Sequence, residues 1–469
     1  MADINKTNFA SSRRNFFNSG IGPTIQPVDI GHADYIGVVE PDSAFWSLIK
    51  KDKLADALTK GDYLHEFHSK RKSFLEEMDT LRFKLKPSAV YFNATERCDL
   101  NCVYCYIPEN LRMNGQSMSK DELFKALGIL KSYFNKNLNG DTKPQIVFHG
   151  SEPMLNKEPI FAAIDKYKED FSFGVQSNGT QLDDEAIEFL TTHGTGIGLS
   201  VDAHNDSVAD RTRKTWSGKS VFKKVIDTLK RLKGYPNYNV ICTATNENKS
   251  ELPEIVEFFH SLEVPACMLN PVRLTLPGAR RVKPQDSELA KYYLKALDRT
   301  YELYKETGRK LVVVNFANVL VSILAPMARR LMCDISPCGG GRCFFAVSAK
   351  GDIFPCSEFI GLEDFKGGNL FEGKIEDTLN SSAIQKVINR RIENVDPCYR
   401  CSIRHFCGSP CPAESVSLNG GMNRPGGFCE LYEEQVRYAF RIIADEKEND
   451  YLWDNWDEET RTTINITSI

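Results

Sequence analysis

The segment Cys98-Asp99-Leu100-Asn101-Cys102-Val103-Tyr104-Cys105 decides the fold of this chain. Its three cysteines stand at C-x3-C-x2-C spacing, directly after a short β-rich run at residues 89–92. Three soft thiolates can hold three irons of a 4Fe-4S cube, and the fourth iron is then left without a protein ligand. A zinc site is the alternative, but zinc motifs pair their cysteines differently. The segment therefore predicts an iron–sulfur cluster with one open iron.

Outward from this segment, β-rich runs alternate with amphipathic helical stretches. The expected strands lie at residues 89–92, 145–149, 171–176, 196–201, 238–245 and 266–270. The expected helices lie at residues 120–134, 158–169, 184–192, 221–233, 251–262, 286–307 and 317–332. Six strands that alternate with helices predict an α/β fold with a parallel sheet, curved into a partial (β/α)6 TIM-like barrel. In such a sheet the functional loops follow the C-terminal ends of the strands.

Beyond Cys333 the chain becomes rich in glycine and cysteine, which predicts a small separate domain stapled by metal. Eight cysteines follow at residues Cys338, Cys343, Cys356, Cys398, Cys401, Cys407, Cys411 and Cys429. Eight thiolates satisfy two closed four-iron cubes, although C-x2-C pairs alone leave a zinc ribbon open. Cys333 is a spare that competes with Cys338 or Cys343 as a ligand. Cys242 and Cys267 fall within expected strands and are predicted to be buried core thiols.

Composition and charge exclude several classes of partner. The net charge of the 469 residues is only −4, so no basic field attracts nucleic acid or an anionic membrane. No apolar run approaches the roughly 18 to 20 residues that a membrane span needs. Ser12-Arg13-Arg14-Asn15-Phe16-Phe17 is similar to a twin-arginine signal, but no apolar core region follows it. A cytoplasmic protein with reduced thiols is therefore expected, and its cysteines are better explained as metal ligands than as disulfides.

The cysteine motif and its placement resemble the radical S-adenosylmethionine (SAM) superfamily, and further segments match that family in order. In the family the open iron chelates SAM, and one electron from the cluster generates a 5′-deoxyadenosyl radical that abstracts a hydrogen atom. By resemblance, Tyr104 packs on the adenine. Gly150, Ser151, Glu152 and Pro153 stand where the family's GGEP segment binds the SAM amino group, with Ser151 replacing the second glycine. Ser177 and Asn178 match a ribose and carboxylate contact, Ser200 and Asp202 match an S-x-D-G segment, and Arg213 or the nearby Arg211 matches a carboxylate-binding arginine.

The C-terminal cysteines resemble the SPASM domain, an extension of radical SAM enzymes that act on peptides and proteins. This resemblance implies one auxiliary cluster on Cys338, Cys343, Cys356 and Cys411, and another on Cys398, Cys401, Cys407 and Cys429. Together with the cluster on Cys98, Cys102 and Cys105, the expected cofactors are three 4Fe-4S clusters and SAM. A flavodoxin or ferredoxin-type protein is the electron donor that the family implies.

The expected reaction is the oxidative modification of a ribosomally made peptide, with formation of a C–S or C–C crosslink as the leading form. Sulfatase maturases carry an Asp base after the cysteine of the Pro-Cys segment, whereas Ser357 follows Pro355-Cys356 here. Glu358 is the candidate catalytic base, and an ordinary surface or cap glutamate is the alternative. A sulfatase-maturase-like enzyme that oxidises Cys or Ser, and a non-catalytic iron–sulfur or zinc protein, stay open as other functions.

The expected domains are an N-terminal extension at residues 1–85, the barrel at 86–325, the cysteine-rich domain at 326–445 and an acidic tail at 446–469. The extension contains the apolar run Tyr35-Ile36-Gly37-Val38-Val39, and helical patterning is expected from Phe45 to about Leu81. One interpretation is a leader-recognition module that binds a peptide as an added strand. The other is packing around the barrel opening, in which Phe45 and Trp46 belong to the core.

Overall fold

The computed structural model describes residues 25–59, 61–139 and 143–456. The segment Ser12-Arg13-Arg14 and the last part of the acidic tail lie outside these residues. Within the described ranges, no helix is long and apolar enough to cross a membrane.

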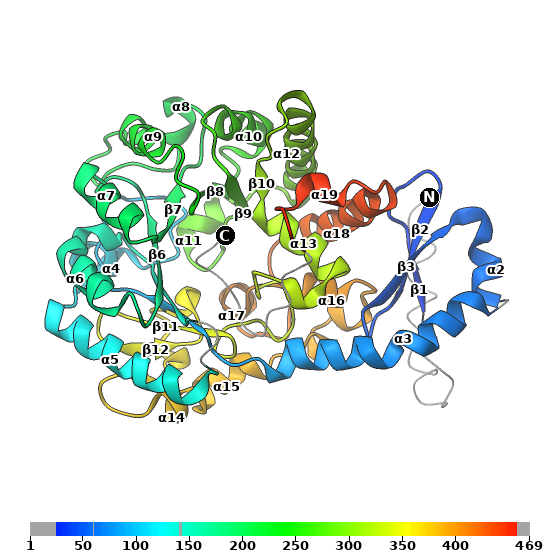
Figure 1. Ribbon diagram of the computed structural model, residues 1–469, viewed down its shortest axis with the longest axis horizontal. Helices are drawn as coiled ribbons and strands as arrows, with labels where there is room; N and C mark the ends of the chain where they lie inside the picture. The colour runs from blue at the N-terminus through cyan, green and yellow to red at the C-terminus, as the bar shows by residue number, and fades with distance from the viewer. Residues whose placement is uncertain (1–24, 60, 140–142, 457–469) are drawn as a thin grey trace.

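A curved parallel sheet forms the centre of the molecule (Figure 1). Its strands are β4 (Ala89–Phe92), β5 (Gln145–Phe148), β6 (Ser172–Ser177), β7 (Gly196–Ser200), β8 (Tyr238–Ala244), β9 (Ala266–Pro271) and β10 (Val312–Val313). They pair in sequence order, and every pair is parallel. The six expected strands and the partial-barrel fold are thus confirmed. β10 adds a short seventh strand, beyond the six that the sequence predicted.

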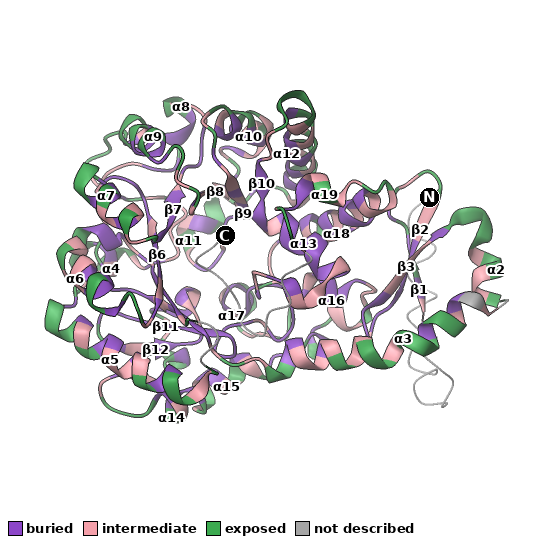
Figure 2. Ribbon diagram, in the orientation of Figure 1, coloured by how far each residue is buried: buried purple, intermediate pink, exposed green. Residues whose placement is uncertain are grey.

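Helices cover the outer face of this sheet, and their buried sides face the strands (Figure 2). They are α5 (Lys120–Asn137), α6 (Lys157–Tyr167), α7 (Asp184–Thr192), α9 (Phe222–Arg231), α10 (Leu252–Ser261) and α12 (Asp286–Thr307). Four more helices lie in the connections: α4 (Glu109–Asn114), α8 (Asp206–Ala209), α11 (Pro277–Arg281) and α13 (Val314–Leu324). Of these, α4 and α11 contact the cysteine loop at the edge of the sheet. Local chemistry sets several boundaries. Ser119 and Glu122 form a reciprocal capping box at the start of α5. The helix expected at 317–332 instead ends at Leu324, because Pro326 lacks the N–H that would continue it.

The cysteine-rich region continues the barrel sheet beyond β4. Strand β11 (Phe344–Val347) pairs parallel with β4, and β12 (Asp352–Phe354) and β13 (Gly368–Asn369) follow in antiparallel pairing. The remaining helices are α14 (Ile375–Leu379), α15 (Ser382–Ile388), α16 (Arg404–Cys407), α17 (Pro412–Asn419), α18 (Cys429–Ala444) and α19 (Glu448–Tyr451). The pairing of β11 with β4 brings the C-terminal cysteines beside the strand that leads into Cys98.

The N-terminal region forms a separate antiparallel sheet in the order β1-β2-β3 (Figure 1). The strands are β1 (Gln26–Val28), β2 (Tyr35–Glu40) and β3 (Phe45–Lys50), and helices α2 (Leu54–Thr59) and α3 (Asp62–Asp79) follow. The expectation of helix from Phe45 onward is wrong for β3, because this aromatic and apolar run pairs along its whole length with β2. Phe45 is buried against Phe67, and the Trp46 Nε1–H donates to the Ile323 carbonyl at 2.8 Å. Both aromatic residues therefore belong to packed interfaces, as the core interpretation predicted.

Candidate active site

The loops that follow β4, β5, β6 and β7 meet at one edge of the sheet, because the strands are parallel. The β4 loop carries the three cysteines of the opening motif. Its backbone is held from two sides: the Cys98 N–H donates to the Arg112 carbonyl at 2.9 Å, and the Trp216 Nε1–H donates to the Cys98 carbonyl at 2.8 Å. The Val103 N–H donates to the Thr212 carbonyl at 3.0 Å. Two separate segments that follow the loop in the chain therefore fix its path.

The thiols of Cys98, Cys102 and Cys105 are half-buried and near one another. Burial raises the pKa of Cys102 to about 11, while Arg213 lowers it and Cys105 raises it further. No three His, Cys, Asp or Glu side chains of the described residues converge closely enough to hold a single metal ion. A four-iron cube places each thiolate on its own iron and needs no such convergence. This set of three thiolates therefore fits the cube.

Asp99, inside the cysteine motif, binds the loop that follows β6. Its two carboxylate oxygens accept hydrogen bonds from Asn178 Nδ2 at 2.8 Å, Thr180 Oγ1 at 2.5 Å and Gln181 Nε2 at 3.0 Å. Asn178 Nδ2 also lies 3.8 Å from Cys98 Sγ. The predicted residues Ser177 and Asn178 are thus brought to the cysteine loop.

The β5 loop also contacts the cysteine loop. The Ser151 hydroxyl donates to the Glu96 carbonyl at 2.6 Å, and the Glu152 N–H donates to the Arg97 carbonyl at 3.0 Å. Gly150 has φ of +81°, and a Cβ there would lie 2.3 Å from Asn93 Nδ2. The amide of Asn93 is buried, and neither its nitrogen nor its oxygen has a hydrogen-bond partner among the described residues. A glycine cradle beside an unsatisfied amide fits the polar amino-acid end of SAM.

Glu152, predicted to bind the SAM amino group, is fully buried and already engaged. One carboxylate oxygen accepts from Ser177 Oγ at 2.8 Å and from the Met154 N–H at 3.0 Å, and the other accepts from the Asn178 N–H at 2.7 Å. Burial raises the pKa of Glu152 to about 7, and these hydrogen bonds oppose the increase. In this structure Glu152 fastens the β5 loop to the β6 loop, and its contact with SAM stays a prediction.

Tyr104, Asp202 and Arg213 form a buried cluster at the end of β7. The Tyr104 hydroxyl donates to Asp202 and accepts from Arg213 Nη2 at 2.7 Å, and Arg213 Nε donates to Asp202 Oδ2 at 3.2 Å. Asp202 Oδ1 also accepts from the Thr243 N–H at 2.8 Å. Of the two candidate arginines, the structure thus places Arg213 in the site. The other, Arg211, lies outside it, with Nη1 on the Glu247 carbonyl.

Ser200, the last residue of β7, is half-buried at the same edge. Pro153 is buried at the first position of the short turn that follows Glu152. Ser200 and Pro153 therefore lie at the C-terminal ends of β7 and β5, next to the loops that the sequence pointed to.

Glu358 lies in a short turn directly after Cys356 and is half-buried. Its Oε2 atom has no hydrogen-bond partner among the described residues. Burial raises the pKa of Glu358 to about 7. The charge of Arg273 opposes this increase, and the charge of Glu414 adds to it. The charge of Glu358 in turn raises the thiol pKa of Cys105, although burial is the larger cause there. The carboxylate therefore lies near both the first cysteine loop and the C-terminal cysteines.

Tyr106 lies near this carboxylate: burial raises the pKa of Tyr106, and the charge of Glu358 raises it further. Tyr106 stacks on His149 with ring centroids 6.2 Å apart, and the Tyr106 hydroxyl is 3.3 Å from His149 Nδ1. Tyr91 meets the other side of His149 edge-on. Burial lowers the pKa of His149 to about 4, so its imidazole is neutral at physiological pH.

The C-terminal cysteines fall into two groups, and none of the fourteen cysteines forms a disulfide. Burial is the main cause that raises the pKa of Cys356, Cys407 and Cys411, and neighbouring thiolates and carboxylates raise these pKa values further. The charges of Cys338 and Cys411 raise the pKa of Cys356, whereas the charges of Cys401, Cys429 and Cys398 raise the pKa of Cys407. These neighbours fit the two sets that the SPASM resemblance implies, and the assignment of ligands to each cluster stays a prediction. Cys333 is exposed and acts on Cys356, while Cys242 and Cys267 are fully buried as predicted.

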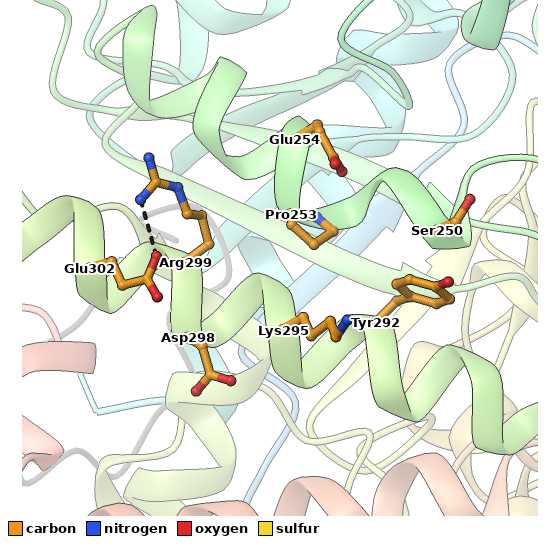
Figure 3. Close-up of a pocket in the computed structure, with 8 residues that line it drawn as sticks. All are labelled: Ser250, Pro253, Glu254, Tyr292, Lys295, Asp298, Arg299 and Glu302. Atoms are coloured by element: carbon orange, nitrogen blue, oxygen red, sulfur yellow. Dashed lines mark hydrogen bonds and ion pairs between the residues drawn. The ribbon is translucent and has the colours of Figure 1, made fainter.

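A cavity of about 410 Å³ lies elsewhere, on the outer side of the barrel between α10 and α12 (Figure 3). Of the charged residues that line it, Arg299 contacts Glu302 at 3.0 Å. It contains no residue of the cysteine loops. We therefore assign the chemistry to the sheet edge.

Sequence reasoning missed several residues of this edge. Asp99 lies inside the decisive motif, and Asn93 directly follows the first strand, so position alone pointed to both. Arg273, just after β9, reaches Tyr432 at 3.4 Å and lowers the pKa of Glu358. No local pattern signals Arg273, because its neighbours come from distant parts of the chain.

Comparisons with known proteins agree with this geometry. Residues 92–259 match the radical SAM superfamily, and residues 338–402 match the SPASM iron–sulfur cluster-binding domain. An uncharacterised protein of Archaeoglobus fulgidus is 38% identical over 86% of this chain and 91% of its own length. The cysteine-type anaerobic sulfatase-maturating enzyme of Clostridium perfringens is 23% identical over 78% of this chain and 98% of its own.

Two further comparisons extend this set. The subtilosin biosynthesis protein AlbA of Bacillus subtilis is 24% identical over 71% of this chain and 69% of its own. The solved structure of anSMEcpe with bound AdoMet superposes with a TM-score of 0.68 at 21% identity, covering 80% of this chain and 98% of that one. The chain belongs to the radical SAM superfamily and carries a C-terminal SPASM domain. It is a radical SAM enzyme, and its cofactors are iron–sulfur clusters and SAM.

Proposed function

We propose that this enzyme is a peptide maturase that oxidatively crosslinks a ribosomally made peptide through a C–S or C–C bond. The observation that carries the proposal is the placement of Glu358. Its Oε2 atom has no hydrogen-bond partner within the described part of the chain, and the carboxylate lies near the first cysteine loop and the SPASM cysteines. Crosslink formation removes hydrogen from the peptide, so a base beside the site of hydrogen abstraction is useful to it.

The residues of the sheet edge have separate tasks in this proposal. Cys98, Cys102 and Cys105 hold the first cluster, which with SAM supplies the 5′-deoxyadenosyl radical. Gly150 and Ser151 present backbone to the amino-acid end of SAM. Arg213 keeps a positive charge beside Tyr104 for the SAM carboxylate. Glu358 accepts the proton that the peptide loses.

The two groups of SPASM cysteines support a proposal of three clusters in all. Cys338, Cys343, Cys356 and Cys411 would hold one auxiliary cluster, and Cys398, Cys401, Cys407 and Cys429 the other. They would carry away the electron left after hydrogen abstraction. A flavodoxin or ferredoxin-type protein would supply electrons to the first cluster, in a reducing cytoplasm that keeps the thiols available.

The N-terminal sheet would bind the peptide leader. In the order β1-β2-β3, β1 and β3 are edge strands, and an edge strand can accept an added strand through main-chain hydrogen bonds. The sheet is anchored to the rest of the protein by Trp46 and by the ion pair of Asp42 with Arg404. A bound leader would therefore be held in a fixed place relative to the barrel.

Sulfatase maturation is the second candidate, and the similarity to the Clostridium perfringens enzyme favours it. Ser357 weighs against it, because a serine hydroxyl is a poor base where those enzymes carry Asp. A cysteine-containing sulfatase peptide separates the two proposals. Conversion of its cysteine to an aldehyde would establish sulfatase maturation and reject the crosslinking proposal.

The central experiment is anaerobic co-expression with the short peptide encoded beside the gene, followed by mass spectrometry of that peptide. We expect a loss of two hydrogens, localised by fragmentation, that disappears in the Cys98→Ala, Cys102→Ala, Cys105→Ala variant. SAM cleavage with an unchanged peptide would reject this substrate. Absence of 5′-deoxyadenosine under reducing conditions would reject enzymatic radical chemistry and leave an electron carrier.

A further inference from the structure

Arg390 is a buried cation that lies between the two groups of SPASM cysteines. Its side chain is only 5% exposed and follows α15. Nε donates to the Met422 carbonyl at 2.8 Å, Nη1 donates to the Ser409 carbonyl at 3.0 Å, and Nη2 donates to Ser409 Oγ at 3.0 Å. Nη2 also reaches the Arg424 carbonyl at 3.5 Å. All these acceptors are neutral.

Most other buried arginines of the protein have a carboxylate partner. Arg329 contacts Asp334 at 2.9 Å, Arg213 contacts Asp202 at 3.2 Å, and Arg82 contacts Glu393 at 2.8 Å. Arg390 makes no ion pair with any carboxylate of the part of the chain that the structure describes. Burying a charge without an opposite charge costs several kcal/mol. A counter-charge of another kind is therefore expected near its guanidinium.

The position of Ser409 indicates what that counter-charge is. Ser409 lies midway between Cys407 and Cys411, which belong to different groups of thiols. On the other side, the Ser336 hydroxyl, two residues before Cys338, donates to the Arg390 carbonyl at 3.2 Å. The Arg390 guanidinium therefore bonds the residue that joins a cysteine of one group to a cysteine of the other.

We propose that Arg390 is a shared counter-charge for both auxiliary clusters and raises the reduction potential of each. A 4Fe-4S cube with four thiolate ligands carries net negative charge, and reduction by one electron increases it. A fixed cation nearby stabilises the reduced form more than the oxidised form, and net charge near a cluster is a main determinant of its potential. This inference rests on the two-cluster assignment of the proposed function. Arg390 is a positioning and tuning residue and does not contact the substrate.

Arg342 provides a matched comparison within the same domain. It is also buried at 5% exposure, and its donors go to the Cys338 and Pro337 carbonyls at 3.3 and 3.0 Å. Arg342 directly precedes Cys343 in the chain, and Cys338 and Cys343 belong to the same group. A buried cation next to one cluster can thus be compared with a buried cation next to both.

The test is a redox titration of the full chain, followed by electron paramagnetic resonance, in the Cys98→Ala, Cys102→Ala, Cys105→Ala background. Only the auxiliary clusters remain there, and dithionite supplies one electron to each. We expect Arg390→Gln to lower both midpoint potentials, with about a tenfold lower ratio of reduced to oxidised cluster at a given potential, or about 59 mV. Arg342→Gln is expected to lower one potential only. Arg391→Gln, at an exposed neighbour, is expected to change neither.

Two results overturn the proposal: unchanged potentials in an Arg390→Gln protein with full iron content, or a change in only one of them. If the Gln variant does not load iron, Arg390→Lys decides. An Arg390→Lys protein with full iron content, and with both potentials near those of the protein that keeps Arg390, supports a role for the charge. If Arg390→Lys does not bind iron, the hydrogen bonds of the guanidinium matter and the charge does not. Iron below two four-iron clusters in the unsubstituted background would instead reject the cluster assignment itself.

Discussion

Asn178 Nδ2 donates a 2.8 Å hydrogen bond to Asp99 Oδ1, and this bond joins the loop after β6 to the loop that carries the first three cysteines. Thr180 and Gln181 donate to the other oxygen of the same carboxylate. One side chain thus satisfies three donors from the neighbouring loop. The cysteine loop is therefore preorganised by a carboxylate that is not itself expected to bind iron.

Asp99→Ala is expected to destabilise the protein, because it removes the charged acceptor that these three donors share and leaves them only longer or competing partners. Each unsatisfied buried donor costs about 1–3 kcal/mol. We expect a lower melting temperature and lower iron occupancy of the first cluster, measured by thermal unfolding and iron analysis under anaerobic conditions. Asp99→Asn keeps one acceptor oxygen, so its melting temperature and iron occupancy should lie between those of the wild type and of Asp99→Ala. Wild-type iron content in the Ala variant would contradict a preorganising role.

Gly150→Ala is expected to abolish SAM binding. The residue has φ of +81°, and the new Cβ would lie within 2.6 Å of three atoms of the Asn93 amide. Gly194→Ala is the matched control, since Gly194 has φ of +62° but open space around its Cβ position. The control should lose only about 1 kcal/mol of stability from backbone strain. Equilibrium dialysis measures the affinity of both reconstituted variants for SAM. Equal affinities would show that the Asn93 side chain moves aside without weakening SAM binding.

The barrel was predictable from the sequence because each βα unit carries its own local signal. The helices at Asp184–Thr192 and Asp286–Thr307 lie where the amphipathic pattern predicted them, and in the structure Asp183 caps the first and Gly308 ends the second in the left-handed conformation. The same kind of evidence failed at Phe45–Lys50. Pairing of this strand with β2 decides its structure, and spacing along one segment carries no information about that partner.

The candidate site divides in the same way. Cysteine spacing predicted which thiols bind the first cluster, and strand order predicted that Glu152, Asn178 and Asp202 lie at one edge of the sheet. The sequence did not show that the carboxylate of Glu152 is engaged by Ser177 and Asn178, because that contact depends on how two loops pack. Long-range partners such as Ser409 for Arg390 are likewise set by tertiary packing, which no local motif encodes.

Tyr104→Phe is expected to raise the KM for SAM several-fold with a smaller effect on kcat. The change removes the hydroxyl that bridges Asp202 and Arg213, so the guanidinium is held by one partner fewer. Tyr235→Phe is the control, because its hydroxyl donates to the Thr195 carbonyl at 2.7 Å, away from the cysteine loop. Both variants should lose about 1 kcal/mol of stability. A kinetic change of equal size in both would mean that the Tyr104 effect is only a loss of stability.

Glu358→Gln tests the base assignment, because the amide keeps the size of the side chain and cannot accept the proton. Loss of a general base typically lowers a rate by about 100-fold or more. Within the described residues, no hydrogen bond or ion pair joins Glu358 to the first cysteine loop or the SAM loops. We therefore expect 5′-deoxyadenosine still to form while crosslinked peptide falls by about that factor. Glu363→Gln, at an exposed position in the next turn, is the matched control and should leave both products unchanged. If peptide product and 5′-deoxyadenosine fall together in the Glu358 variant, the residue acts on cluster assembly or SAM cleavage. If neither falls, the proton goes to another group, and the nearby neutral imidazole of His149 is then the next one to replace.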